Sequence, residues 1–221
     1  MIPLRYHQPV RTVPVINMGL IAANLAIYLW LFGLVAFPNQ QHLDQVGRLM
    51  LFPNQVRVGM GWQSIFTAMF VHANIVHLGG NMLYLWIFGN NVEDRLGPLK
   101  YLGLYLACGV AAAFFQVWMT PVGVISTVPV LGASGAISGI LGAYLVLFPL
   151  AKVTTAVLLV FFVRLPALVV IGSWIALQAL EAYAVEGSSS HAMGGVAWFA
   201  HLGGFACGVA LSAAVRVMGN S

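Results

Sequence analysis

The sequence predicts an all-α membrane protein in which six transmembrane helices form one bundle. Hydrophobic residues make up 61% of the 221-residue chain and charged residues only 6%, whereas soluble domains carry about 25% charged residues. Apolar runs of a length suited to a bilayer recur along the whole chain. We expect one domain of six spans over residues 15–221, preceded by a polar N-terminal segment, residues 1–14.

Six apolar runs account for the expected spans. In chain order they are residues 15–36, 64–91 with entry near Ile75, 97–119, 132–150, 166–180 and 196–217. A helix needs about 20 apolar residues to cross a bilayer, so the fourth run is short for a span. Lys152 and Arg164 bracket an apolar run of eleven residues. That run is too short to cross as a helix, so we expect a surface segment or a lead-in to the fifth span.

Two connections between the spans are long. Residues 37–62 are more polar than the spans but contain several apolar residues. We expect this loop to pack on the membrane surface or dip into it. Residues 181–195 are rich in Gly and Ser and are expected to form a loop.

The basic residues indicate how the six spans are oriented. Six spans place both termini on the same side of the membrane. Seven basic residues fall on that side: Arg5, Arg11, Arg95, Lys100, Lys152, Arg164 and Arg216. Only Arg48 and Arg57 fall on the other side. Because cytoplasmic loops carry the excess of Lys and Arg, both termini are expected to be cytoplasmic.

Composition also excludes some functions and compartments. The nine basic residues are scattered singly, so the net charge of +4 does not indicate a nucleic-acid partner. Cys108 and Cys207 lie in apolar runs of small residues and are expected to be buried thiols. Neither a cleavable signal peptide nor a transit peptide is recognisable in the first residues. The sequence therefore favours an integral protein of a bacterial inner membrane.

Ser134 is the first candidate catalytic residue. It begins the fourth span within the run Gly132-Ala133-Ser134-Gly135, where the free N–H groups and the positive end of the helix dipole are found. An oxyanion formed by attack of Ser134 on a carbonyl would meet donors there. Gly132 and Gly135 let the backbone turn and approach a bound chain closely. Alternatively, Gly135 and its small neighbours form only a helix-packing face.

His201 supplies the base that a serine needs to become a nucleophile. Gly204 and Gly208 follow at i+3 and i+7 and so share its helix face. Glycine faces on the fourth and sixth spans would let the two backbones approach closely. The expected topology also places Ser134 and His201 at the same depth, near the outer membrane face. A histidine that merely caps a helix is the alternative, but the shared depth favours a Ser134–His201 pair.

His72, His77 and Asn81 form a third polar cluster, at the entry to the second span. His77 and Asn81 are four residues apart on one helix face, and neutral donors there could hold a developing oxyanion. Metal binding by the two histidines is the rival, but no carboxylate or cysteine joins them. We therefore expect no metal and no cofactor. Only Glu181 and Glu186 approach the outer ends of the spans, so a dyad is simpler than a triad.

These residues together resemble the rhomboid intramembrane serine proteases. The matching stretches are His72-x4-His77-Leu-x2-Asn81-Met82, Phe88-Gly89-x3-Glu93, Gly132-Ala-Ser134-Gly135, Ala197-Trp198-x2-His201 and His201-x2-Gly204-x3-Gly208. The resemblance implies a six-transmembrane-helix, rhomboid-like bundle with a water-filled cavity open to the outer face. It implies Ser134 as nucleophile, His201 as base, and an oxyanion site made of His77, Asn81 and the Ser134 N–H.

Two positions depart from the pattern of some family members. Trp62-Gln63 stands where they have Trp-Arg, so the anchoring of the first loop differs. Ser138 stands where they place an aromatic ring that stacks on the histidine, so the histidine must be oriented otherwise. Neither departure removes a catalytic group.

The sequence thus predicts a protease that cleaves membrane-anchored proteins near the outer face of the bilayer. A non-proteolytic relative that binds transmembrane segments is the alternative, although such relatives usually lack the serine or the histidine. A small transporter or channel is disfavoured, because no inverted repeat is evident and almost no polar lining exists outside one cluster. A substrate helix must enter the site sideways from the lipid. We therefore expect the fifth span and residues 181–195 to be the mobile elements that move aside.

Overall fold

The computed structural model describes residues 2–36, 39–121, 129–157, 160–186 and 197–218. Within these residues, four helices are long and apolar enough to cross a membrane. They are α1 (Val15–Ala36), α7 (Pro98–Met119), α9 (Ala167–Glu186) and α10 (Trp198–Met218). The helix α8 (Ser134–Leu147) is apolar but shorter. The protein is a mostly helical, integral membrane protein.

The expected second span is a chain of three consecutive helical pieces. These are α5 (Ile75–Tyr84), the π-helical turn η2 (Leu85–Gly89) and α6 (Asn90–Leu96). A π-turn loses regular backbone hydrogen bonds, and here the Asn17 side chain donates to Leu85 O at 2.9 Å. Gly97, at φ +82°, ends α6, and Pro98 begins α7 at the next position. Glycine is favoured just after the end of a helix and proline at its first position.

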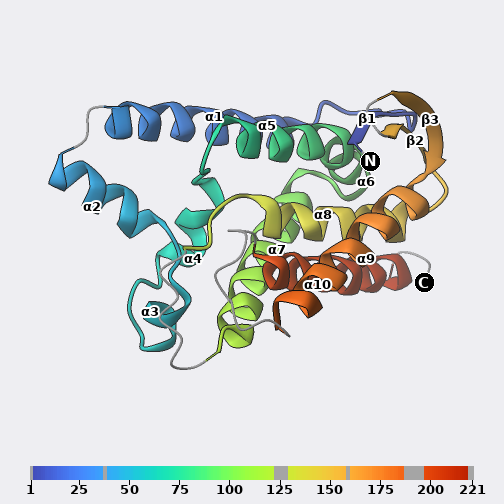
Figure 1. Cartoon of the computed structure of the whole chain (residues 1–221). Helices are drawn as coiled ribbons and strands as arrows, with labels where there is room; N and C mark the ends of the chain where they lie inside the picture. Colours follow the sequence, from blue (N-terminus) through green and yellow to red (C-terminus); the bar gives the residue numbers. More distant parts are fainter. Residues whose placement is uncertain (1, 37–38, 122–128, 158–159, 187–196, 219–221) are drawn as a thin grey trace.

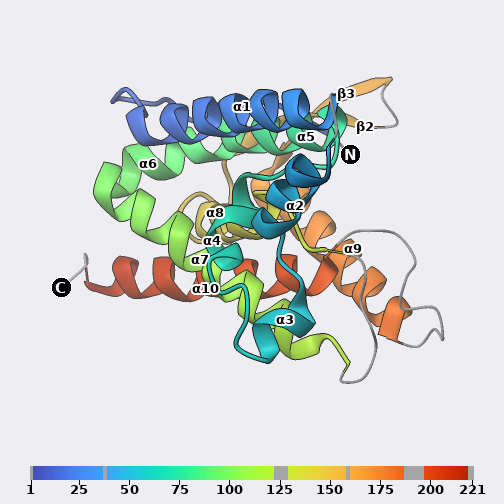
Figure 2. The ribbon, with the colours of Figure 1, turned by 90° about the vertical axis from the view of Figure 1, so that its left-hand side faces the viewer.

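The bundle is built around α8. Figure 1 shows α1 and α5 side by side on one face and α10 on the other, and Figure 2 shows the same layers after a 90° turn. Every residue from Gly135 to Tyr144 is buried, because α8 packs against α7 and α10 and also contacts α5 and α9. A short apolar helix surrounded by other helices can be hydrophobic all round, and this is why α8 shows no polar face.

Glycines set the distance between α8 and α10. A Cβ placed on Gly208 would lie 1.9 Å from Gly139 O, and one placed on Gly204 would lie 2.0 Å from Gly135 O. Only glycine fits at either position, because real Cβ atoms never come so close to a carbonyl oxygen. The expected contact between glycine faces of the fourth and sixth spans is confirmed.

Four short helical segments occupy the region between α1 and α5. They are α2 (Gln40–Leu49), α3 (Pro53–Arg57), α4 (Ser64–Thr67) and the 3₁₀ turn η1 (Ala68–Phe70). The Arg57 guanidinium donates to the last carbonyls of α7, including Val117 O and Thr120 O at the α7 C-terminus. A cation at a helix C-terminus is stabilising, and Arg57 thereby fastens this region to the bundle. Its location at the membrane surface stays a prediction.

The expectation of an all-α chain is wrong in one respect. A three-stranded antiparallel sheet of order β1-β2-β3 joins β1 (Ile2–Tyr6), β2 (Lys152–Val157) and β3 (Phe161–Pro166). The strands β2 and β3 occupy the run between Lys152 and Arg164 that is too short to span. That run is rich in Val, Thr and Phe, which favour a pleated conformation. The N-terminal segment supplies the third strand, so it is part of the folded unit.

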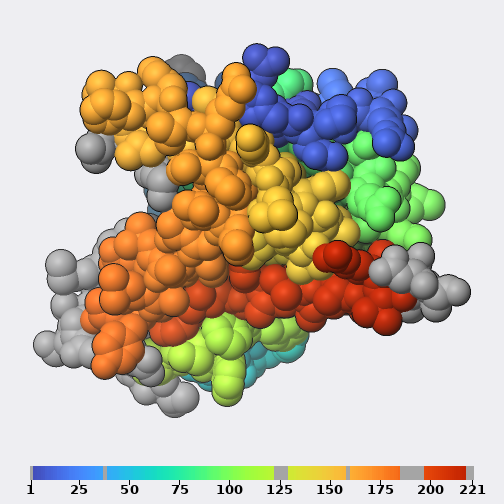
Figure 3. Space-filling model, turned by 90° about the vertical axis from the view of Figure 1, so that its right-hand side faces the viewer, coloured from blue at the N-terminus to red at the C-terminus, as the bar shows by residue number. Residues whose placement is uncertain are grey.

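The fifth span is longer than expected. It begins at Ala167 rather than Pro166, and the helix continues to Glu186. Residues 181–186, expected to be loop, are helical because Glu and Ala are good helix formers. The Gly- and Ser-rich residues 187–195 lie outside the described residues. Figure 3 shows β3 and α9 running along the molecular surface beside α8, with α10 crossing below them.

Candidate active site

Ser134 is the first residue of α8, and the turn before it depends on glycine. Gly132 has φ +110°, and a Cβ there would lie 2.7 Å from the His77 ring. Its N–H donates to Ala68 O at 2.8 Å, which fixes the approach of the chain to α8. Within α8, Ser138 Oγ donates to Ser134 O at 2.6 Å. The serine therefore begins a helix, where backbone N–H groups have no intrahelical partner.

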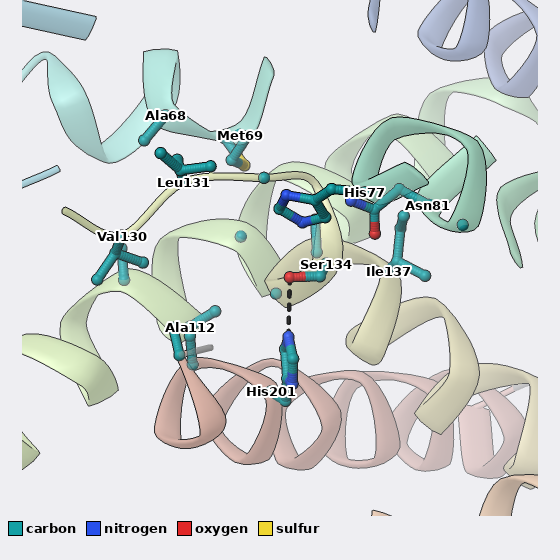
Figure 4. A pocket seen from close by; sticks show the side chains of 18 of the residues that line it. Ala68, Met69, His77, Asn81, Ala112, Val130, Leu131, Ser134, Ile137 and His201 are labelled. Atoms are coloured by element: carbon teal, nitrogen blue, oxygen red, sulfur yellow. Dashed lines mark hydrogen bonds between the residues drawn. The ribbon is translucent and has the colours of Figure 1, made fainter. Parts of the chain in front are cut away.

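The structure brings Ser134 and His201 together. His201 Nε2 lies 2.8 Å from Ser134 Oγ, within hydrogen-bonding distance. The two residues come from α8 and α10, and the close contact of these helices through Gly135 and Gly204 makes the distance possible. Figure 4 shows the His201 ring rising from α10 toward the Ser134 hydroxyl. A serine in contact with an imidazole nitrogen is the arrangement that activates the hydroxyl as a nucleophile.

The His201 ring is held by a residue that the sequence reasoning missed. His201 Nδ1 lies 2.5 Å from Oε1 of Gln178 on α9. The rings of Trp174 and Trp198 flank the imidazole, with centroids 5.7 and 6.3 Å away. These three contacts orient the histidine where Ser138 offers no ring. A glutamine inside an otherwise apolar span was the available signal, since buried amides in membrane helices bond to neighbouring helices.

His77 and Asn81 lie on the opposite side of Ser134 from His201. Both project from α5 toward the serine (Figure 4), and both line the same cavity as Ser134 and His201. Asn81 Nδ2 is buried and has no hydrogen-bond partner among the described residues. A buried donor without a partner is costly, so this amide is placed to donate to a group that arrives with a ligand.

His72 packs on His77 and is not among the residues that line the cavity. The two rings meet edge to face with centroids 5.1 Å apart. His72 is only 7% exposed, and neither of its ring nitrogens has a partner within the described part of the chain. Among these residues, no three His, Cys, Asp or Glu side chains are grouped as metal ligands would be. The described contact of His72 is thus its ring packing on His77.

The cavity has a volume of about 560 Å³. Apolar residues from α7, α8, η1 and the segment before α8 form much of its wall, and α4, α5 and α9 add Ile65, Val76 and Trp174. The polar side chains of His77, Asn81, Ser134 and His201 line the same cavity. A pocket with an apolar wall and a few convergent polar groups is typical of sites that bind and position a substrate.

Comparison with known proteins identifies the family of this chain. Residues 59–217 match the family model of the Rhomboid domain. The mitochondrial rhomboid protein 1 of Saccharomyces cerevisiae is 37% identical over 147 residues, which is 66% of this chain and 40% of the yeast protein. Rhomboid protease GluP of Bacillus subtilis is 38% identical over 84 residues, which is 38% of this chain and 15% of GluP.

A chloroplast protein also resembles part of this chain. The chloroplastic rhomboid-like protein 11 of Arabidopsis thaliana is 38% identical over 79 residues, covering 36% of this chain and 27% of the plant protein. The chain thus spans less than half the length of each of these relatives. The family model, in contrast, matches most of the chain, because residues 59–217 include both Ser134 and His201. The chain therefore belongs to the rhomboid family.

Proposed function

We propose that this protein is an intramembrane serine endopeptidase with Ser134 as nucleophile and His201 as general base. The observation that carries the proposal is the 2.8 Å contact between Ser134 Oγ and His201 Nε2 across two helices. Family membership supports it, because GluP is named a rhomboid protease. The alternative of a non-proteolytic binder of transmembrane segments has no need of such a contact.

The reaction follows from the positions of these groups. His201 Nε2 takes the proton from Ser134 Oγ as the oxygen attacks the carbonyl carbon of the scissile peptide bond. The resulting oxyanion accepts hydrogen bonds from the Ser134 N–H, the His77 side chain and Asn81 Nδ2. His201 then gives its proton to the leaving nitrogen, and the C–N bond breaks. Water attacks the acyl-enzyme by the same route and restores the serine.

The proposed setting is a six-span bundle with both termini in the cytoplasm. The six spans are α1, α5 with η2, α7, α8, α9 and α10. This topology places Ser134 and His201 near the outer membrane face, where membrane-anchored substrates would be cut. Scattered basic residues favour this orientation by the positive-inside rule. We propose the inner membrane of a bacterium as the location, although the relatives include mitochondrial and chloroplast proteins.

Covalent labelling tests the proposal directly. A fluorophosphonate probe reacts with an activated serine, so the purified protein in detergent or nanodiscs should be labelled at Ser134. The variants Ser134→Ala and His201→Ala should not be labelled, whereas Ser138→Ala, which alters a serine four residues away, should be. Equal labelling of wild type and Ser134→Ala would refute the assignment of the nucleophile.

A further inference from the structure

We propose that Gln178 is the positioning residue for the catalytic base, a neutral third member of the Ser134–His201 site supplied by α9. The inference rests on the proposed function of Ser134 and His201. Gln178 is 5% exposed, and its Oε1 lies 2.5 Å from His201 Nδ1. It contacts the second ring nitrogen of His201, the one that does not face Ser134.

The chemistry of an amide oxygen fixes the state of the histidine. A carbonyl oxygen only accepts hydrogen bonds, so the proton of the neutral imidazole must be on Nδ1, facing Gln178. Nε2 then carries a lone pair toward Ser134 Oγ, and the serine hydroxyl donates across the 2.8 Å contact. This is the tautomer in which histidine can accept the serine proton. With the proton on Nε2 instead, the histidine would be unable to act as a base.

A neutral residue suits this position better than a carboxylate. His201 and Gln178 are both buried in helices that are expected to lie in the bilayer. A charged side chain there would have to be stripped of water, whereas an amide keeps the hydrogen bond without that cost. An aspartate partner would also stabilise the imidazolium that forms during the reaction. Gln178 fixes the orientation and the tautomer of the His201 ring, but it does not stabilise the imidazolium as an aspartate would.

The position of Gln178 also ties the base to α9. Trp174 lies one turn earlier on the same helix, and its ring packs on both His201 and Tyr84 of α5, with centroids 5.7 and 6.4 Å apart. A displacement of α9 away from α10 would therefore remove two supports of the imidazole together. Ser134 and His201 would remain on α8 and α10, whose glycine contact does not involve α9.

The first test separates orientation from structure by kinetics. Gln178→Met keeps the length of the side chain but removes the acceptor, and we expect kcat to fall on the order of 10–100-fold, the loss typical of a misplaced catalytic group. KM for a transmembrane substrate should change little. Leu177→Met, on the exposed face of the same helix, is the matched control and should retain wild-type kcat. Wild-type kcat in Gln178→Met would overturn the proposal.

The second variant, Gln178→Glu, keeps an acceptor and adds a charge. It should recover activity relative to Gln178→Met near neutral pH. The introduced carboxylate favours protonated His201, so the acid limb of the pH–rate profile should move to higher pH by about one unit or more. A residue with a purely structural role would leave the profile where it was, and an unmoved profile would count against the proposal.

A third measurement does not depend on activity. In protein labelled with ¹⁵N-histidine, the chemical shifts of the two ring nitrogens report which one carries the proton. We expect His201 to be protonated on Nδ1 in the wild type and to lose this preference in Gln178→Met. If wild type shows this tautomer but neither labels nor cleaves, the proposed protease function fails, and what remains is that Gln178 fixes the tautomer of His201. A proton on Nε2 in wild type overturns the role of Gln178 alone.

Discussion

Gly204 lies directly against the carbonyl group of Gly135, so that a Cβ on Gly204 would come within 2.0 Å of the carbonyl oxygen. Each glycine follows one member of the Ser134–His201 pair along the chain. Gly135 comes one residue after Ser134, and Gly204 comes three residues after His201. The 2.8 Å contact between Ser134 and His201 therefore depends on a backbone contact one turn away.

Substitution of Gly204 by valine should separate α8 from α10. The added methyl groups overlap the Gly135 backbone, and overpacking of this kind costs at least ~1–3 kcal/mol of unfolding free energy. Turnover should fall by about 100-fold or more, because a 1 Å displacement between nucleophile and base is enough for such a loss. Cleavage of a transmembrane substrate and thermal unfolding in detergent would measure both effects.

Gly103→Val on α7 is the matched control for that variant. A Cβ on Gly103 meets nothing within 4 Å, so the protein should keep both its stability and its turnover. Full activity of Gly204→Val would show that α10 can shift without loss of the Ser134–His201 contact.

Ser134 and His201 should behave as one unit in a double-mutant experiment. Ser134→Ala and His201→Ala should each lower kcat on the order of 10⁴-fold or more, and the double variant should be no slower than either single variant. The cause is that the serine is nucleophilic only while the base accepts its proton. Additive losses in the double variant would mean that the two side chains work independently.

Movement of α9 should be needed for transmembrane substrates. The rings of Tyr84 on α5 and Trp174 on α9 are in contact, so cysteines at these two positions can be joined by a short crosslinker in a background lacking Cys108 and Cys207. The crosslinked protein should cleave a transmembrane substrate more slowly than the same double-cysteine protein before crosslinking.

A short soluble peptide, which need not enter between helices, provides the control for the crosslink. Its hydrolysis should be affected much less by the crosslinker. If the crosslinked and free proteins cleave transmembrane substrates at the same rate, entry takes place elsewhere.

Acidification should release the N-terminal segment from α6. The Thr12 hydroxyl and the backbone N–H groups of Thr12 and Arg11 donate to Asp94 Oδ1. These bonds, together with the Arg11 charge, hold the pKa of Asp94 below its usual value of 3.8. A depressed pKa stabilises the folded state above pH 3.8, and this stabilisation is lost as the pH falls through the lower, folded-state pKa.

The variant Asp94→Asn makes this pH dependence measurable. At neutral pH it should have a lower Tm than wild type and be cut faster by trypsin after Arg11. The difference in Tm should shrink below pH 3.8 and vanish once Asp94 itself is protonated. A constant difference in Tm down to pH 2 would rule out the carboxylate as its source.

The long helices and the contact between Ser134 and His201 were predictable because the sequence signals of each segment are local. Val15–Ala36 is a run without charged residues, apolar except for Asn17 and Asn24, and the helix in the structure begins and ends at the same residues. The glycines after His201 are spaced to share one helix face, so their contact with α8 followed from periodicity. Ser134 was marked by the glycines around it and by its place at the start of an apolar run.

The sheet, the role of Gln178 and the π-turn could not be predicted, because each depends on a partner far away in the sequence. β1 pairs with β2, whose residues follow about 150 positions later, and no local pattern in residues 2–6 indicates that partner. Gln178 is one amide within an apolar helix, and its role appears only when α9 is placed against His201. The π-turn at Leu85–Gly89 depends on Asn17 from α1, which satisfies the Leu85 carbonyl.

The three-stranded sheet has a consequence for the order in which the chain is assembled. Ile2 pairs with Ala156, and Tyr6 pairs with Val153. Synthesis runs from the N-terminus, so the first strand emerges from the ribosome long before its partner exists. The sheet can close only after α8 has been made. Its closure therefore marks a late stage of biogenesis, and a chain arrested before residue 152 would leave residues 2–6 available to other strands or to chaperones.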